Sequence, residues 1–337
     1  MIIYIILAFG CFIKLYFFSI KVYKSEADIG HGIMFHHFHG MGSIDHPRGE
    51  GSLSADDFAR MIEFIGRDRI IDAKEWFRRA LSGGLKKEDI VLTFDDSLLC
   101  QIEVAKPVLD SYGIKGAFFI YSSVLEGEIV KLELYRIFRN KYFKNFNDFF
   151  DAFMKIDSEF SGKVKEAVKN FPEDYMIEYR CHTREGRMFR YIRDIGLSRA
   201  EYEKIMDDFI NEYGGLEELG IKRWMGDDDI LNLVKEGHVV GMHSYSHPTK
   251  MEILSKREQE EEYRKNRDHV ERVVGKQDFL VASHPSNSYN TDTLAVLDDL
   301  GVEIAFCSNM SKGVVGKFEY PREDHAHVWE IMQKNKI

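Results

Sequence analysis

Two short motifs carry side chains that can bind a metal ion or move a proton, and each motif ends an apolar run. Asp95 and Asp96 directly follow the buried-type run IVLTF. His243 and His247 accompany the run HVVGMHS in the same way. A carboxylate and two imidazoles that leave positions open for water are the ligand set of a hydrolytic metal centre.

The spacing within each motif constrains how its side chains reach one site. Neighbouring residues on a strand point to opposite faces, but the chain can twist at a strand end, so Asp95 and Asp96 can serve one site in different roles. If the chain turns helically after the second run, His243 and His247 lie on one helix face and hold a single ion. Each motif alone has a simpler interpretation, a solvated turn or a pair of surface histidines. The combination is the stronger signal.

The elements that must position these motifs alternate along the chain. We predict strands at residues 32–38, 90–94, 115–121, 238–244, 278–283 and 302–307. We predict helices from Ser54 onward and at residues 101–112, 226–236, 255–274 and 291–300. This rhythm indicates parallel βα units, and in a parallel barrel the carboxyl ends of the strands gather the active site.

Residues 131–222 interrupt this alternation with aromatic-rich helical patterns such as LYRIFRNKYF and FNDFFDAFMKI. We predict a helical insertion here. Its aromatic side chains form a helix core in the simpler interpretation. In the alternative, they form a lid or a platform for sugar rings.

Composition narrows the class of protein. The 337 residues carry a net charge of −10, whereas a protein that binds a phosphate backbone normally has a basic face, so we expect no nucleic-acid partner. A hydrophobic content of 44% can supply a sizeable core. The 4 cysteines form no CxxC pair, so they signal neither a zinc knuckle nor a disulfide framework, and they fit a reducing compartment.

The first 20 residues are almost wholly apolar apart from Lys14, and Lys21 and Lys24 come directly after them. A run of about 20 apolar residues can span a bilayer, and basic residues on its C-terminal side favour a cytoplasmic location for the rest of the chain. We therefore predict possible membrane association through residues 1–20 and a location in the cytoplasm or on the cytoplasmic face of the membrane. The alternative is that residues 1–29 are a non-native tail added by an upstream start codon.

With their flanks, the two motifs resemble the polysaccharide deacetylase superfamily, carbohydrate esterase family 4, with its nodulation-type deacetylase domain. Residues 91–120, VLTFDDSLLCQIEVAKPVLDSYGIKGAFFI, resemble its first signature, and residues 237–249, GHVVGMHSYSHPT, its second. The resemblance runs from about residue 32 to 324, so we expect residues 30–337 to form the catalytic domain. It implies an α/β fold, a distorted, TIM-like (β/α) barrel of about seven parallel strands.

The resemblance also implies roles for individual residues. Asp95 matches the catalytic base, and Asp96, His243 and His247 match the metal ligands, with Zn²⁺ the usual ion. The chemistry agrees with these roles. A divalent metal polarises the acetyl carbonyl and lowers the pKa of water, and a carboxylate that is not a ligand can remove the water proton.

The sequence departs from the family at the third motif, which commonly carries an Arg ahead of a Pro–aromatic step. Here Ser283 occupies the Arg position, Pro285 remains, and Ser286 replaces the aromatic residue. The backbone N–H of Ser286 can still hold the oxyanion, because a backbone donor does not depend on the side chain. Arg322 is our candidate replacement for the missing Arg. The alternative is a surface Arg in a polar loop.

The general acid is the second departure. The family usually supplies it from a late His in a Leu-x-His context, which this chain lacks. His325 and His327 lie late enough, but their surroundings differ. His36 resembles a His on the first strand of many members, so it is our candidate for donating a proton or holding substrate. A solvated loop histidine is the alternative.

The sequence therefore predicts a metal-dependent hydrolase that removes an N-acetyl group from a sugar of a glycan or glycan precursor, in surface-polysaccharide biosynthesis or modification. Its predicted partner is the N-acetylated saccharide substrate. Two alternatives stay open: a related metal-dependent amidase acting on a small non-sugar amide, and an inactive carbohydrate-binding homologue.

Overall fold

The computed structural model describes residues 23–24, 28–49, 51–177, 183–215, 219, 222–310 and 316–335. The apolar segment 1–20 lies outside these residues, so its predicted membrane association stays a prediction. Every helix in the described residues is too short or too polar to cross a membrane.

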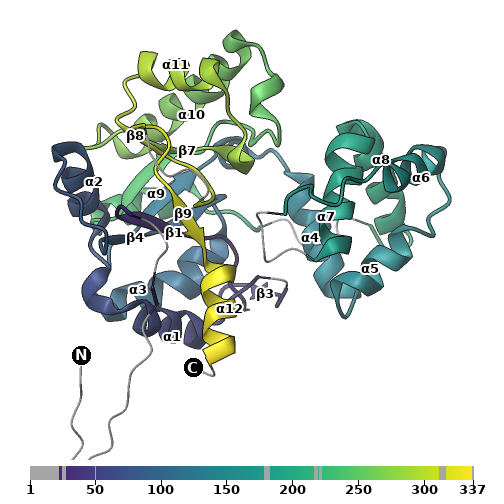
Figure 1. The fold of residues 1–337 in the computed structure, drawn as a ribbon, viewed down its shortest axis with the longest axis horizontal. Helices are drawn as coiled ribbons and strands as arrows, with labels where there is room; N and C mark the ends of the chain where they lie inside the picture. Colours follow the sequence, from purple (N-terminus) through teal and green to yellow (C-terminus); the bar gives the residue numbers. More distant parts are fainter. Residues whose placement is uncertain are drawn as a thin grey trace, which may run out of the picture.

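One sheet of 7 parallel strands forms the centre of the molecule, in the order β8-β7-β6-β5-β4-β1-β9. The strands are β1 (His31–Phe35), β4 (Ile90–Asp95), β5 (Ala117–Ile120), β6 (Val239–Met242), β7 (Val281–Ser283), β8 (Ile304–Phe306) and β9 (Arg322–Asp324). A parallel bridge between Phe306 of β8 and Tyr320, just before β9, brings the two edges together. The sheet is thus nearly closed, and the predicted distorted (β/α) barrel is confirmed (Figure 1).

Helices cover this sheet on its outer side. They are α1 (Ala55–Ile65), α2 (Ala73–Ser82), α3 (Lys106–Tyr112), α9 (Asp227–Lys235), α10 (Lys256–Val274), α11 (Thr291–Asp299) and α12 (His325–Asn335). The Ser54 side chain caps α1 in a reciprocal capping box with Asp57, as the sequence indicates. A small hairpin of β2 (Gly40–Met41) and β3 (Asp45–His46) follows β1. The sequence-based prediction lacks helices α2 and α12, strand β9 and the two strands of this hairpin.

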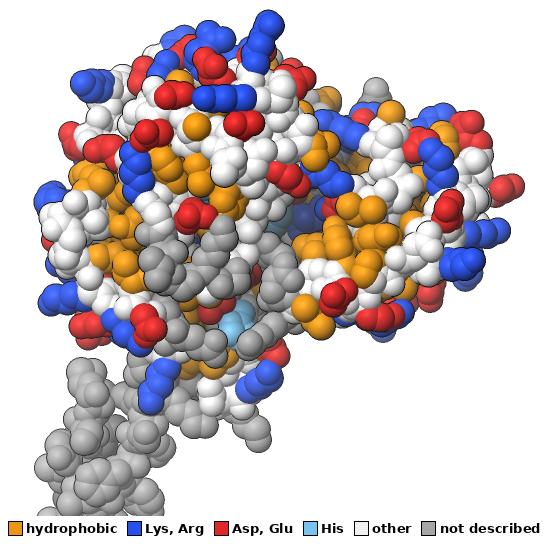
Figure 2. All heavy atoms as spheres, turned by 45° about the horizontal axis from the view of Figure 1, so that its top comes forward, with side chains coloured by type: hydrophobic (Ala, Val, Ile, Leu, Met, Phe, Trp, Pro, Cys, Tyr) orange, Lys and Arg blue, Asp and Glu red, His pale blue; other side chains and the backbone are white. Residues whose placement is uncertain are grey.

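In the described part of the span predicted as an insertion there are five α-helices, and they stand to one side of the barrel (Figure 1). They are α4 (Lys131–Tyr142), α5 (Phe146–Phe153), α6 (Ser161–Lys169), α7 (Arg184–Tyr191) and α8 (Arg199–Asn211). Their aromatic rings pack against one another: the centroid of Phe149 lies 5.2 Å from that of Phe189, and the centroid of Phe138 lies 5.3 Å from that of Phe209. Most of the aromatic content is therefore helix core. The surface is hollowed between these helices and the barrel (Figure 2).

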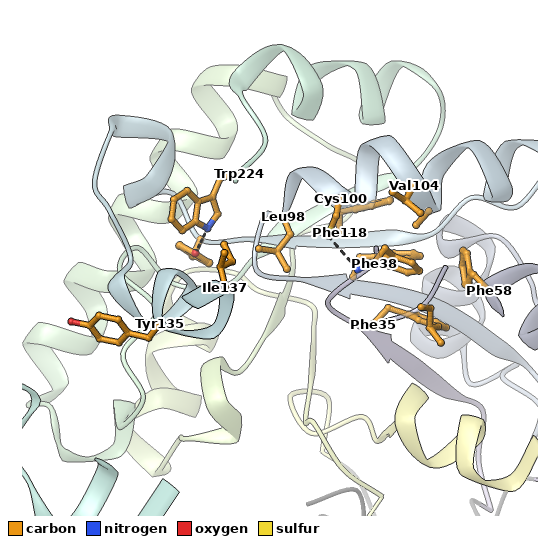
Figure 3. Close-up of a cluster of buried hydrophobic side chains, with 14 of the residues drawn as sticks. Phe35, Phe38, Phe58, Leu98, Cys100, Val104, Phe118, Tyr135, Ile137 and Trp224 are labelled. Atoms are coloured by element: carbon orange, nitrogen blue, oxygen red, sulfur yellow. Dashed lines mark hydrogen bonds between the residues drawn. The ribbon is translucent and has the colours of Figure 1, made fainter. Parts of the chain in front are cut away.

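An aromatic cluster fixes the strand that leads to Asp95. The ring of Phe94 on β4 stacks on Phe118 at 4.6 Å and on Phe35 at 5.4 Å, measured between ring centroids. Phe58 on α1 meets Phe35 edge-on at 5.0 Å, so the helix is tied to the same cluster (Figure 3). Because Phe94 is fully buried and precedes Asp95 directly, this packing sets the position of the motif.

Replacing Phe94 tests this dependence. We expect Phe94→Ala to lower the free energy of unfolding by about 3–5 kcal/mol, since the substitution leaves a cavity in a close-packed core. Urea unfolding followed by circular dichroism measures the change. Leu81→Ala on α2 is the control, because Leu81 is 47% exposed, and its effect should stay within about 0.5 kcal/mol. Equal effects of the two variants would contradict the role given to Phe94.

Candidate active site

Three side chains converge at the carboxyl ends of β4 and β6. Oδ1 of Asp96 lies 3.4 Å from Nε2 of His243 and 3.2 Å from Nε2 of His247. Burial alone would raise the pKa of Asp96, but the two neighbouring imidazoles hold it well below its usual range. The carboxylate therefore stays ionised at neutral pH.

The donor set of these three residues fits a divalent metal ion. Oδ1 of Asp96 is buried and has no hydrogen-bond partner in the described part of the chain. Nδ1 of His243 lies 2.9 Å from the carbonyl oxygen of Ser283, so Nδ1 carries a proton and Nε2 is the nitrogen available to bind a metal ion. The three potential ligand atoms lie within 4.8 Å of one another. A cation bound here would satisfy the orphaned carboxylate oxygen.

The loop that carries the two histidines is not helical, which corrects one expectation. Ser244 and His247 adopt left-handed backbone angles, with φ of 63° and 53°. The N–H of His247 donates to Oγ of Ser244 at 3.1 Å, and the Glu262 carboxylate of α10 accepts two backbone hydrogen bonds from the loop. The two histidines thus meet through a loop held by α10 instead of through a helical turn.

Left-handed backbone angles concentrate at the predicted site. In the described residues, the non-glycine positions with positive φ are Asp96, Ser97, Met176, Ser244, His247, Ser286 and Asn287. All except Met176 lie at a predicted site residue or next to one. The φ of 78° at Asp96 is the twist that lets Asp95 and Asp96 serve one site, at a cost in backbone strain that the surrounding packing must offset.

Arg322 lies against Asp95 inside the barrel. Its Nη1 and Nη2 donate to Oδ1 and Oδ2 of Asp95, both at 2.7 Å, and the Arg322 side chain is fully buried. Burial would raise the pKa of Asp95, but the Arg322 guanidinium beside it lowers the pKa below its usual value. Arg322 is therefore not the surface Arg of the alternative interpretation.

Ser283 explains how an Arg from a different strand fits at this point. The Ser283 hydroxyl donates to Oδ2 of Asp95 at 3.1 Å and accepts from Nη2 of Arg322 at 2.6 Å. A large side chain at position 283 would occupy the space of the guanidinium. The small side chain on β7 and the Arg on β9 thus form one arrangement around the Asp95 carboxylate.

The remaining predicted residues lie around the same cavity. Nε2 of His36 is 4.0 Å from Oδ2 of Asp96, and both side chains line the cavity. Ser286 also lines the cavity, in the single turn after β7, while Pro285 is buried behind it. Nε2 of His243 is 3.8 Å from Oδ2 of Asp95, so the predicted base lies beside the predicted ligands.

The two late histidines have other partners. The ring nitrogens of His325 lie 3.0 Å and 2.6 Å from the carbonyl oxygens of Met34 and Gly51. His327 pairs with Glu323, with 3.0 Å between Nδ1 and Oε1. Among the histidines weighed as the acid, His36 is therefore the one placed beside the three converging side chains.

Asn266 is a positioning residue that the motifs do not reveal. Its Oδ1 accepts from the N–H of His243 at 3.1 Å, and its Nδ2 donates to the carbonyl of Ile120 at 2.9 Å. The side chain is fully buried on α10, a helix that is otherwise strongly charged. The sequence feature that could have identified Asn266 is a neutral polar residue on the apolar face of a helix that is otherwise strongly charged.

Comparisons with known proteins give a match to one family model and several structures of similar fold. A sequence model of the family described as polysaccharide deacetylase matches residues 205–305, which include His243 and His247 but not Asp95 or Asp96. No curated protein matches the chain.

Solved structures share the fold. The Streptococcus pyogenes deacetylase PplD in complex with acetate superposes with a TM-score of 0.53 at 14% identity, covering 91% of this chain and 97% of that chain. IcaB from Ammonifex degensii gives a TM-score of 0.51 at 14% identity, covering 90% and 98%. The resemblance to polysaccharide deacetylases that the two motifs predict is confirmed.

Metal binding can be tested directly. We expect His243→Ala to bind Zn²⁺ at least about tenfold more weakly than the wild-type chain, because one of the three ligands is lost. Calorimetric titration of chelator-treated protein with Zn²⁺ gives the affinity. His327→Ala, which removes a histidine outside the triad, is the control. Wild-type affinity in His243→Ala would exclude the proposed ligand set.

The ion pair of Asp95 predicts a pH-dependent stability. Arg322→Gln leaves a buried carboxylate without its counter-charge, so we expect a loss of about 3–5 kcal/mol at pH 7. The lowered pKa of Asp95 means that the pair contributes stability above the ordinary value of 3.8, and that this contribution is lost as pH falls through the folded pKa. In Arg322→Gln, burial is opposed by His243 and His36 but no longer by the guanidinium, so the pKa of Asp95 rises. The carboxylate of the variant is then protonated at a higher pH than in wild type, and the difference in stability between the two proteins narrows as the pH falls.

Unfolding wild type and Arg322→Gln in the presence of a chelator, at pH 7 and at pH 4, measures the difference between their free energies of unfolding. Lys87→Gln, which removes a surface partner of Asp28, should behave as wild type at both pH values. An equal loss at both pH values in Arg322→Gln would show that the Asp95 carboxylate is not the cause.

Proposed function

We propose that the protein is a metal-dependent hydrolase that removes the N-acetyl group from a sugar of a glycan or glycan precursor. The observation that carries the proposal is that two neighbouring carboxylates have different surroundings, which suit different roles. Oδ1 of Asp96 faces two imidazoles and has no hydrogen-bond partner among the described residues, while Asp95 is held by Arg322 and Ser283. One carboxylate suits a cation, and the other is left for proton transfer.

The residues of the chain suit the steps of amide hydrolysis. A divalent metal held by Asp96, His243 and His247 polarises the acetyl carbonyl and acidifies water when it is bound. Asp95 accepts the proton of the attacking water, and the guanidinium of Arg322 keeps it ionised for that task.

The second half of the reaction falls to two other groups. The backbone N–H of Ser286 donates to the oxyanion of the tetrahedral intermediate. His36, which lines the cavity beside Asp96, gives a proton to the departing amine. We assign the metal as Zn²⁺, since it favours a four-coordinate site with imidazole and carboxylate ligands and an open position.

The substrate assignment rests on the family and on the cavity. The cavity has a volume of about 1170 Å³, more than a small-molecule site normally needs, so it suits a sugar with further groups attached. The structure of the similar PplD deacetylase contains acetate, the product expected of this reaction. We extend the proposal to surface-polysaccharide assembly at the cytoplasmic face of the membrane.

Acetate release tests the proposal and the base together. With Zn²⁺ and N-acetylglucosamine oligomers, we expect wild type to release acetate and Asp95→Asn to be about 10²–10⁴-fold slower with its metal retained, because the general base is lost. Asp278→Asn is the control, since this carboxylate is 69% exposed and pairs with Lys74 on the surface.

The outcomes separate the alternatives. Wild-type acetate release from Asp95→Asn would remove Asp95 from the mechanism. Turnover of small amides without turnover of the sugars would favour an amidase. Sugar binding without acetate release under any metal would favour an inactive carbohydrate-binding protein.

A further inference from the structure

The wall of the cavity that the insertion supplies is basic. Four of its lining side chains are arginines from α4, α7 and the turn after α7: Arg136, Arg139, Arg190 and Arg193. Among the described residues of this wall, the one carboxylate that lines the cavity is Asp194, which binds Arg193 at 2.7 Å. The whole chain has a net charge of −10, so this local concentration of guanidinium groups runs against its composition. Basic side chains are visible in the hollow beside a histidine (Figure 2).

Arg136 is held in position by a carboxylate behind it. Its Nε donates to Oε2 of Glu133 at 3.1 Å, and the same oxygen lies 2.9 Å from Nε2 of His37. Burial would raise the pKa of Glu133, but Arg136 and His37 lower it to about 2, so this charge is permanent. Glu133 thus fixes the guanidinium of Arg136 from one side, next to the histidine that comes after His36.

Two buried donors on the same helix face lack acceptors. Nη1 of Arg136 and Nδ2 of Asn140 are buried and have no hydrogen-bond partner in the described part of the chain. Residues four apart share a face of α4, and Asn140 lies so close to the loop at Gly49 that a Cβ there would meet its Nδ2 at 1.9 Å. Gly49 lines the cavity. Of these two residues, Arg136 lines the cavity. Because an unpaired buried donor is unfavourable, an acceptor that reaches Nη1 of Arg136 from the cavity would be stabilising.

The chemistry of the missing acceptor can be inferred from the donors. A guanidinium group donates hydrogen bonds and accepts none, and its fork matches the oxygens of a phosphate in a bidentate way. A carboxylate offers two oxygens and one charge, whereas a phosphate or diphosphate offers more of both. The cavity has room for a phosphate beside a sugar at the metal site.

We propose that this arginine wall binds a phosphate or diphosphate group attached to the N-acetylated sugar. The substrate class is then a sugar phosphoester, in which a nucleotide, a lipid carrier or a polymer can lie beyond the phosphate. The proposal deepens the proposed function and rests on it for the reaction, but not for the binding of the anion.

Binding can be measured without turnover. Calorimetry with inorganic pyrophosphate in a chelator tests the anion site while no metal can recruit the ligand. We expect wild type to bind, Arg136→Gln to bind roughly tenfold more weakly or worse, and added salt to weaken wild-type binding. Arg78→Gln is the matched control, since it removes the same charge from a side chain that is 64% exposed and pairs with Glu75.

Arg190→Gln serves as a second variant if circular dichroism shows that Arg136→Gln does not fold. Absence of binding in wild type would overturn the proposal. The proposal would also be overturned if the folded variant, Arg136→Gln or Arg190→Gln, bound pyrophosphate as tightly as wild type and Arg78→Gln do.

Turnover then tests the substrate class. We expect wild type to favour N-acetylglucosamine 1-phosphate and UDP-N-acetylglucosamine over a neutral N-acetylglucosamine trimer by about tenfold in kcat/KM, and this ratio to fall toward one in Arg136→Gln. Comparing kcat/KM among the sugar 1-phosphate, the nucleotide sugar and a short-chain lipid-diphosphate sugar shows which group beyond the phosphate the enzyme prefers. A wild-type ratio of one, or a ratio unchanged in Arg136→Gln, would contradict the proposal.

Failure of the reaction and failure of the anion site give different results. If no substrate releases acetate but pyrophosphate binding depends on Arg136, the proposed function is wrong and the anion site stands. If the neutral trimer releases acetate and pyrophosphate does not bind, the proposed function stands and the anion site is wrong.

Discussion

The buried ion pair between Asp95 and Arg322 is the interaction on which the rest of the site depends. A carboxylate that is 2% exposed would be strongly disfavoured without a charge and hydrogen bonds around it. Arg322 supplies two of those bonds from β9, and Ser283 supplies another from β7. The ion pair and the Ser283 hydrogen bond therefore link β4, β7 and β9. Because Asp95 is bound in this way, Asp96 is the carboxylate that faces the histidines.

Much of this could be predicted from the sequence, and the failures have physical causes. Strong apolar runs, such as those before Asp95 and His243, identify strands because burial on both faces demands such residues. Strand β9 has the sequence Arg-Glu-Asp, which reads as a polar loop because its Arg is buried through a partner distant in sequence. The left-handed turn at His247 depends on Ser244 and Glu262, and no local pattern in the chain indicates it.

The lining of the cavity is a second feature that could not be predicted from the sequence. The aromatic residues of the insertion were weighed as a sugar platform, but they mainly pack among themselves, as Phe149 and Phe189 do. Tyr175 is the aromatic residue among the described residues of the insertion that line the cavity, and four of the others are arginines, such as Arg136 and Arg190. Their common orientation results from the way α4 and α7 pack, so their grouping is visible only in three dimensions.

The origin of Arg322 on β9 has a consequence for the order in which the protein matures. Asp95 and Arg322 are 227 positions apart in the sequence. At the usual pace of synthesis, the guanidinium leaves the ribosome roughly 10–45 s after the carboxylate that it neutralises. During that interval Asp95 has no counter-charge from β9, and burying it would be costly, so the nascent barrel is biased to stay open beside β1. Strand β9, the last strand in the described part of the chain, thus completes the sheet and also supplies the counter-charge of Asp95.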